Sequence, residues 1–142
     1  MNREHSVVAF QEQIREIFGF LITEYGFIEL PSDDHHRLTY EAALVSVEVR
    51  GVHWGLGTEV YVRPTKTKIT SVFDSVPLWS IVKHHRADLY EAFRAVEGQI
   101  PQARASANVL RDAFGSLLSG DTYLLSAPRQ FLEDRMAKSG NA

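Results

Sequence analysis

The spacing of apolar residues between Arg37 and Arg63 constrains the fold more than any other feature of the sequence. Around this stretch apolar residues recur every three or four positions, but within it they alternate with polar residues. The apolar set comprises Leu38, Tyr40, Val45, Val47, Val49, Val60 and Val62, and the polar set comprises Thr39, Glu41, Ser46, Glu48, Arg50, Glu59, Tyr61 and Arg63. This alternation predicts antiparallel strands that bury one face of a sheet and leave the other face uncovered.

The same residues predict how the two longest strands pair. Side chains alternate between the two faces, so a shift of one residue would move every valine to the polar face. One register places valines opposite valines inside and opposite charges together outside. The expected pairs are Val47 with Val62, Glu48 with Tyr61, Val49 with Val60, and Arg50 with Glu59.

Helical spacing and turn residues predict the remaining elements. The expected helices span residues 7–25, 78–96 and 101–118, with a last helix after Gly120 that Pro128 interrupts near its start. Short strands are expected at Phe27 to Leu30 and at Lys68 to Phe73. No linker or repeat divides the chain. The order predicts a single α+β domain over residues 1–142, with an antiparallel sheet of three to four strands and with the N-terminal helix and the C-terminal helices packed on one face.

Composition excludes several classes of protein. The 142 residues contain no cysteine, which excludes disulfides, thiolate nucleophiles and cysteine zinc sites and fits a reducing compartment. No apolar run approaches the roughly 20 residues of a membrane span, and the first residues lack the pattern of a signal peptide. A net charge of -3 provides no basic stripe for nucleic acid. We therefore expect a cytoplasmic protein that binds neither membrane nor nucleic acid.

Histidines and serines are the candidates for chemistry, and none stands in a known motif. Asp33 to His36 form one acidic and histidine-rich loop, and His84 lies one helical turn before Asp88. His85 falls on an apolar stripe, where a histidine bonded to a carbonyl is the usual occupant. No serine has the context of a nucleophile elbow, and residues 51–57 lack the ending of a phosphate loop. We expect neither metal nor cofactor, and an enzyme is less favoured than a binding protein.

Trp54 is the residue that most suggests recognition. It lies in the loop that joins the two longest strands, after Gly51 and before Gly55 and Gly57. A ring displayed there could anchor a partner, because tryptophan is enriched at binding hot spots. It could also fold back over the open end of the sheet, and the general burial of large rings favours this second interpretation.

Two stretches resemble small uncharacterised bacterial proteins, some of which are immunity proteins of polymorphic toxins. In the first, Tyr25-Gly26-Phe27 ends a helix and is followed by a Tyr-Glu strand that leads into Val45-Ser46-Val47-Glu48-Val49, and the second is Leu117-Leu118-Ser119-Gly120-Asp121. The resemblance implies an α+β binding protein without a cofactor, whose task is to cover a partner. It carries over no functional residue. The weak acidity of this chain argues against a nuclease as that partner.

We therefore expect a protein-binding module, of the immunity or inhibitor kind, whose partner is another protein and could be a toxin. The predicted partner-binding residues are Trp54, Glu48, Arg50, Glu59, Tyr61 and Arg63. The alternative is a small cofactorless enzyme or a small-ligand binder with a pocket between sheet and helices. The uncovered face or a sheet edge could also make a homodimer.

Overall fold

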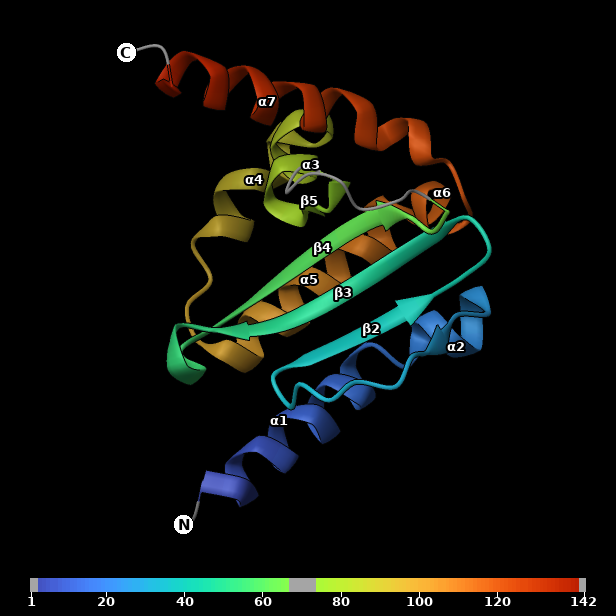
Figure 1. Ribbon diagram of the computed structural model, residues 1–142, viewed down its shortest axis with the longest axis vertical. Helices are drawn as coiled ribbons and strands as arrows, with labels where there is room; N and C mark the ends of the chain where they lie inside the picture. Colours follow the sequence, from blue (N-terminus) through green and yellow to red (C-terminus); the bar gives the residue numbers. More distant parts are fainter. Residues whose placement is uncertain (1–2, 67–73, 141–142) are drawn as a thin grey trace.

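The computed structural model describes residues 3–66 and 74–140 and shows one sheet with helices against it (Figure 1). The strands are β1 (Ile28–Glu29), β2 (Arg37–Glu41), β3 (Val45–Val52), β4 (Gly57–Pro64) and β5 (Val76–Pro77). The helices are α1 (Arg3–Ile17), α2 (Phe20–Tyr25), α3 (Leu78–His85), α4 (Ala87–Arg94), α5 (Gln99–Ala113), α6 (Gly115–Leu118) and α7 (Ser126–Gly140). The 3-10 helices whose bounds lie within the described residues are η1 (His53–Gly55) and η3 (Thr122–Leu125).

The sheet is antiparallel throughout and has the strand order β1-β2-β3-β4-β5. The predicted α+β class is confirmed, but the sheet has five strands rather than three to four. The additional strand is β5, which has two residues and is therefore too short to show alternation. The expected edge strand from Lys68 to Phe73 lies outside the described residues.

The predicted register of β3 and β4 is confirmed at all four expected pairs. Val47, Val49 and Val62 are completely buried, and they point to the same face as Leu38 and Tyr40 of β2. The core lies on this face, because valines on adjacent strands form one continuous apolar surface.

Helices α1 and α5 lie behind β2, β3 and β4 and cover this inner face (Figure 1). They approach the sheet closely at Gly51 of β3. A Cβ atom there would lie 3.0 Å from Gln99 Nε2 and 3.2 Å from Phe10 Cζ. Any larger residue at this point would have to displace the Gln99 or Phe10 side chain, so glycine fits here because of close packing and not because of an unusual backbone angle.

The three helices predicted before Gly120 are all divided in the structure, and the third, over residues 101–118, breaks at Phe114 between α5 and α6. The first breaks at Phe18 and Gly19, where the hydrogen bonds tighten to a three-residue spacing, and α2 ends at Gly26 in the left-handed conformation as expected. The second breaks at Arg86, whose φ of -136° and ψ of 61° are not helical. Pro128 does not interrupt α7, since it lies in the first turn, where no backbone N–H is needed.

Helix α7 does not lie on the sheet but crosses α3 at the top of Figure 1. Its start is attached by Arg129, whose Nη2 lies 2.9 Å from the buried carboxylate of Asp74. Phe131 of α7 is 46% exposed and lines a groove together with Lys83 and His84 of α3. In the described part of the chain, no helix is both long enough and apolar enough to span a bilayer.

Candidate functional site

The tip of the β3–β4 hairpin presents Trp54 to solvent. The Trp54 side chain is 100% exposed, so the interpretation in which the ring folds back over the sheet is wrong. The end of the sheet is covered instead by side chains of α5, because Gln99 Nε2 donates to the Gly57 carbonyl and Gln102 Oε1 accepts from the Thr58 N–H.

The backbone at this tip is strained. His53 and Trp54 have φ angles of 54° and 55°, in the left-handed region that residues with a Cβ atom rarely occupy. Leu56, which follows the turn, is 73% exposed. Two consecutive strained residues therefore hold an aromatic and an aliphatic side chain in water, and strain of this kind is concentrated at functional sites.

The outer face of the sheet carries a connected set of charged and aromatic side chains. The Glu48 carboxylate lies 2.9 Å from Arg37 Nε and 2.8 Å from Arg50 Nε. The Arg50 guanidinium lies 4.5 Å from the centre of the Tyr61 ring, and the Tyr61 hydroxyl donates to Glu59. We call these five residues the outer-face network: Arg37, Glu48, Arg50, Glu59 and Tyr61.

The contacts within the network raise the pKa values of two of its members. Partial burial and the hydrogen bond to Glu59 raise the pKa of Tyr61 to about 12. The hydrogen bonds that Arg50 donates to the Glu48 carboxylate raise the pKa of Arg50 above its already high value. At neutral pH the tyrosine is therefore a neutral donor and the arginine a permanent cation.

The six residues predicted to bind a partner are thus only partly brought together. Glu48, Arg50, Glu59 and Tyr61 contact one another in the network. Trp54 projects from the hairpin tip nearest to the Arg50 and Glu59 pair. Arg63 lies four residues further along β4 than Glu59, which is about 13 Å, and its Nη1 donates to the Thr65 carbonyl at 3.4 Å.

Sequence reasoning omitted Arg37 from this surface, although the alternation could have found it. Arg37 pairs with Arg50 across β2 and β3, on the same face as Thr39 and Glu41. Its position at the first residue of a short strand made the pattern weak. In the structure it supplies the second cation for Glu48.

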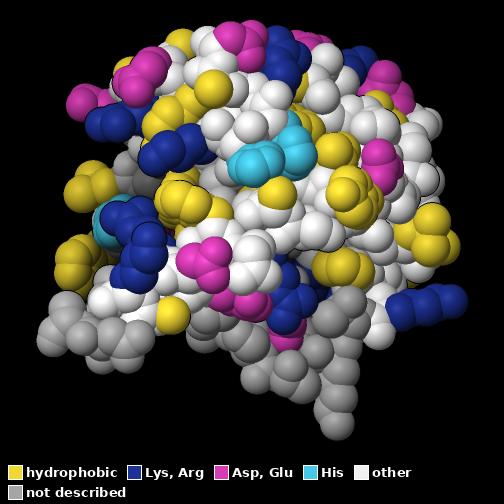
Figure 2. Space-filling model, turned by 90° about the horizontal axis from the view of Figure 1, so that it is seen from above, with side chains coloured by type: hydrophobic (Ala, Val, Ile, Leu, Met, Phe, Trp, Pro, Cys, Tyr) yellow, Lys and Arg dark blue, Asp and Glu magenta, His cyan; other side chains and the backbone are white. Residues whose placement is uncertain are grey.

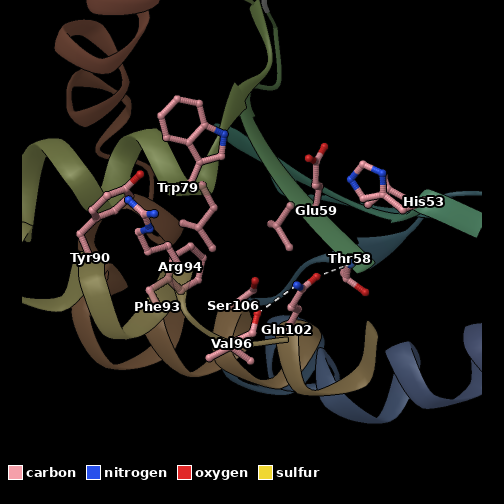
Figure 3. Close-up of a pocket in the computed structure, with 13 residues that line it drawn as sticks. His53, Thr58, Glu59, Trp79, Tyr90, Phe93, Arg94, Val96, Gln102 and Ser106 are labelled. Carbon is pink, nitrogen blue, oxygen red and sulfur yellow. Dashed lines mark hydrogen bonds between the residues drawn. The ribbon is translucent and has the colours of Figure 1, made fainter. Parts of the chain in front are cut away.

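A second candidate site is a cleft with a volume of about 290 Å³ between β4 and the helices α3, α4 and α5 (Figure 3). It is lined by residues of β3, η1, β4, α3, α4, the α4–α5 loop and α5, which include Glu59, Trp79, Tyr90, Arg94, Gln102 and Ser106. His53 reaches it from the hairpin tip, but Trp54 does not line it. Sequence analysis raised a pocket between sheet and helices as an alternative without assigning residues to it.

The histidine candidates do not assemble a metal site in the described residues. In the Asp33 to His36 loop, Asp34 Oδ1 accepts from the His36 backbone N–H at 2.9 Å. Asp88 pairs with Arg86 at 2.8 Å. Within residues 3–66 and 74–140, no three histidine, aspartate or glutamate side chains come close enough to share an ion.

His85 has the structural role expected for a histidine on an apolar stripe. Its Nε2 lies 2.7 Å from the Leu124 carbonyl, to which it donates, and it thereby connects α3 to η3. The neighbouring His84 ring is exposed, and the centres of the His84 and His85 rings lie 4.7 Å apart.

On the face shown in Figure 2, histidine and hydrophobic side chains lie among acidic and basic ones, and the two signs of charge are interspersed.

The chain is thus an α+β protein with an exposed tryptophan at a hairpin tip, a network of paired charged side chains on the outer face of its sheet, and a cleft between β4 and the helices. Comparison with protein-family models, with curated proteins and with solved structures finds no match to this chain.

Proposed function

We propose that this chain is a cytoplasmic protein-binding module that covers a protein partner with its hairpin tip. Trp54 is the anchor of the interface, and the outer-face network forms the polar surface around it. The single observation that carries the proposal is the Trp54 side chain, which is 100% exposed on a left-handed backbone.

The energetics of the free chain support this role for the tip. Left-handed backbone costs an L-residue roughly 1–2 kcal/mol, and a fully exposed ring makes no contacts within the protein that offset this cost. Burial of the ring against a partner would supply the missing contacts, and tryptophan is among the residues that contribute most to interfaces. Leu56, also exposed, extends the apolar contact beside it.

The outer-face network suits the rim of such an interface. Its side chains are already held by one another, so little conformational freedom remains to be lost when a partner binds. Glu48 in particular has only 14% of its side chain exposed. The rim therefore determines orientation and specificity, while the tip supplies affinity.

The kind of partner follows from the resemblance to immunity proteins together with the charge of the surface. The network contains cations and carboxylates in near balance, which suits a protein of mixed charge rather than a nucleic acid. We infer an immunity or inhibitor protein whose partner is a toxin-like protein.

Site-specific photocrosslinking tests where a partner binds. A photoreactive phenylalanine replaces Trp54 in one variant, and it replaces Tyr123 in a matched control, whose side chain is 82% exposed on η3. The account predicts a crosslink to one host protein from position 54 and none from position 123. Equal crosslinking from both positions would contradict this prediction. If the occupant of the tip is a second copy of the chain, light scattering of the protein alone at two concentrations will show a dimer.

A further inference from the structure

The cleft beside β4 is open along an unpaired strand edge. β3 pairs with one edge of β4 along its whole length, whereas β5 pairs with the other edge at Tyr61 and Val62 only. From Thr58 to Val60 this second edge of β4 has no neighbouring strand in the described chain. Helices α3 and α4 form the opposite wall, and α5 forms the floor (Figure 3). The cleft shares His53 with the hairpin tip and Glu59 with the outer-face network, but Trp54, the proposed anchor for the partner, does not line it.

The floor of the cleft contains the hydroxyl group of Ser106. The residue is 3% exposed, and its hydroxyl is open to the cleft and forms no hydrogen bond with any described residue. Figure 3 shows that its hydroxyl points into the cavity. The neighbouring Gln102 is not free in this way, because its amide is bonded to Thr58 at 2.8 Å and to the Val96 carbonyl at 3.0 Å. A hydroxyl at the floor of a cleft can fix the orientation of a ligand that brings a polar atom to it.

The walls above this hydroxyl are aromatic. Trp79, Tyr90 and Phe93 line the side formed by α3 and α4. The Trp79 nitrogen is turned toward the side of Glu59 in Figure 3. A volume of about 290 Å³ falls at the lower end of the range for small-molecule sites. These features suit one aromatic ring rather than a larger ligand.

Charges of opposite sign lie on the two sides of the cleft mouth. Arg94 extends from α4, is 60% exposed at its side chain, and has its nearest carboxylate, that of Glu91, 4.0 Å away. Glu59 extends from β4 on the other side (Figure 3) and accepts one hydrogen bond, from Tyr61. A ligand with both an anionic and a cationic group can therefore pair with both walls.

We propose that the cleft binds a free aromatic amino acid with a hydroxyl on its ring, of the tyrosine type. The ligand carboxylate pairs with Arg94, and the ammonium group pairs with Glu59. The ring lies against Trp79 and Phe93, and the ring hydroxyl bonds to Ser106 at the floor.

Calorimetry with four small probes tests the proposal. L-tyrosine is compared with L-phenylalanine, which lacks the ring hydroxyl, with tyramine, which lacks the carboxylate, and with 4-hydroxyphenylpropionate, which lacks the ammonium group. L-tyrosine is expected to bind at least tenfold more tightly than each of the other three. In a Trp54→Phe background, Trp79 is the remaining tryptophan, so a fluorescence change on binding places the ligand in the cleft.

Two variants test the contact of the ring hydroxyl with Ser106 and the contact of the carboxylate with Arg94. Ser106→Ala is expected to abolish the preference for L-tyrosine over L-phenylalanine, and Arg94→Gln is expected to abolish the preference over tyramine. Ser80→Ala is the matched control, because Ser80 is equally buried but lines a different groove. Absence of L-tyrosine binding to the folded wild type, equal binding of all four probes, or an unchanged tyrosine preference in Ser106→Ala would each overturn the proposal.

Discussion

The buried carboxylate of Asp74 lies 2.9 Å from Nη2 of Arg129 and thereby joins the segment before β5 to the start of α7. The arginine is 41% exposed at its side chain, while the carboxylate is 2% exposed. Arg129 also bonds to Glu133 one turn later at 3.0 Å. Among the described residues, the ion pair between Asp74 and Arg129 is the main polar contact that attaches α7, which does not lie on the sheet.

Arg129→Ala is therefore expected to destabilise the protein. Removal of the cation leaves a buried carboxylate with less compensation, which costs about 2 kcal/mol. Urea unfolding followed by circular dichroism measures the loss. Arg135→Ala on the same helix is the control, because Arg135 is exposed and forms no ion pair with the described residues. Equal stability of the two variants would show that the pair contributes nothing.

Tyr40→Phe is expected to leave stability unchanged or to raise it by up to about 1 kcal/mol. The Tyr40 hydroxyl is buried and finds no hydrogen-bond partner in the described chain, so nothing favourable is lost with it. Tyr40→Leu, in contrast, removes a ring whose centre lies 6.4 Å from that of Phe18, and it should cost about 2 kcal/mol. Chemical denaturation distinguishes the two, and a large loss in Tyr40→Phe would contradict the assignment.

The strands and the core were predictable because their signal is periodic. Val47, Val49 and Val62 occupy alternate positions over long strands, so both their face and their register follow from counting. Gly26 ends its helix as expected, because few other residues adopt a φ of 72° readily.

The remaining features depend on contacts that no local pattern records. Asp74 and Arg129 lie far apart in the sequence, and β5 is too short for alternation. The break at Arg86 occurs without glycine or proline. The cleft exists because β5 ends after pairing with Val62 and Tyr61, and the exposure of Trp54 depends on how α5 covers the end of the sheet.

Stability is expected to fall as the pH rises through the range of Tyr61. The pKa of this tyrosine is about 12 in the folded protein against an ordinary value near 10, so between these values the folded state binds more protons than the unfolded state. The contribution is complete below pH 10 and is lost as pH approaches about 12. The urea midpoint should therefore decline less steeply over this range in Tyr61→Phe than in the wild type. Identical slopes would contradict the raised pKa.

Trp54→Gly is expected to be more stable than Trp54→Ala by about 1 kcal/mol, because glycine adopts a φ of 55° without steric strain. The ring itself contributes no contacts to the fold, so both variants should retain the native circular dichroism spectrum. Thermal and urea unfolding of the pair give the difference. Greater stability of the alanine variant would show that the backbone at the tip is not held in the left-handed region.

The affinity of the crosslinked partner, purified and titrated against Trp54→Ala and Tyr123→Ala, tests partner binding by the hairpin tip most directly. Loss of a hot-spot tryptophan typically costs 2 kcal/mol or more, which corresponds to roughly 30-fold. The account predicts that Trp54→Ala weakens the Kd at least tenfold while Tyr123→Ala leaves it unchanged. An affinity for Trp54→Ala within twofold of the wild type would contradict it.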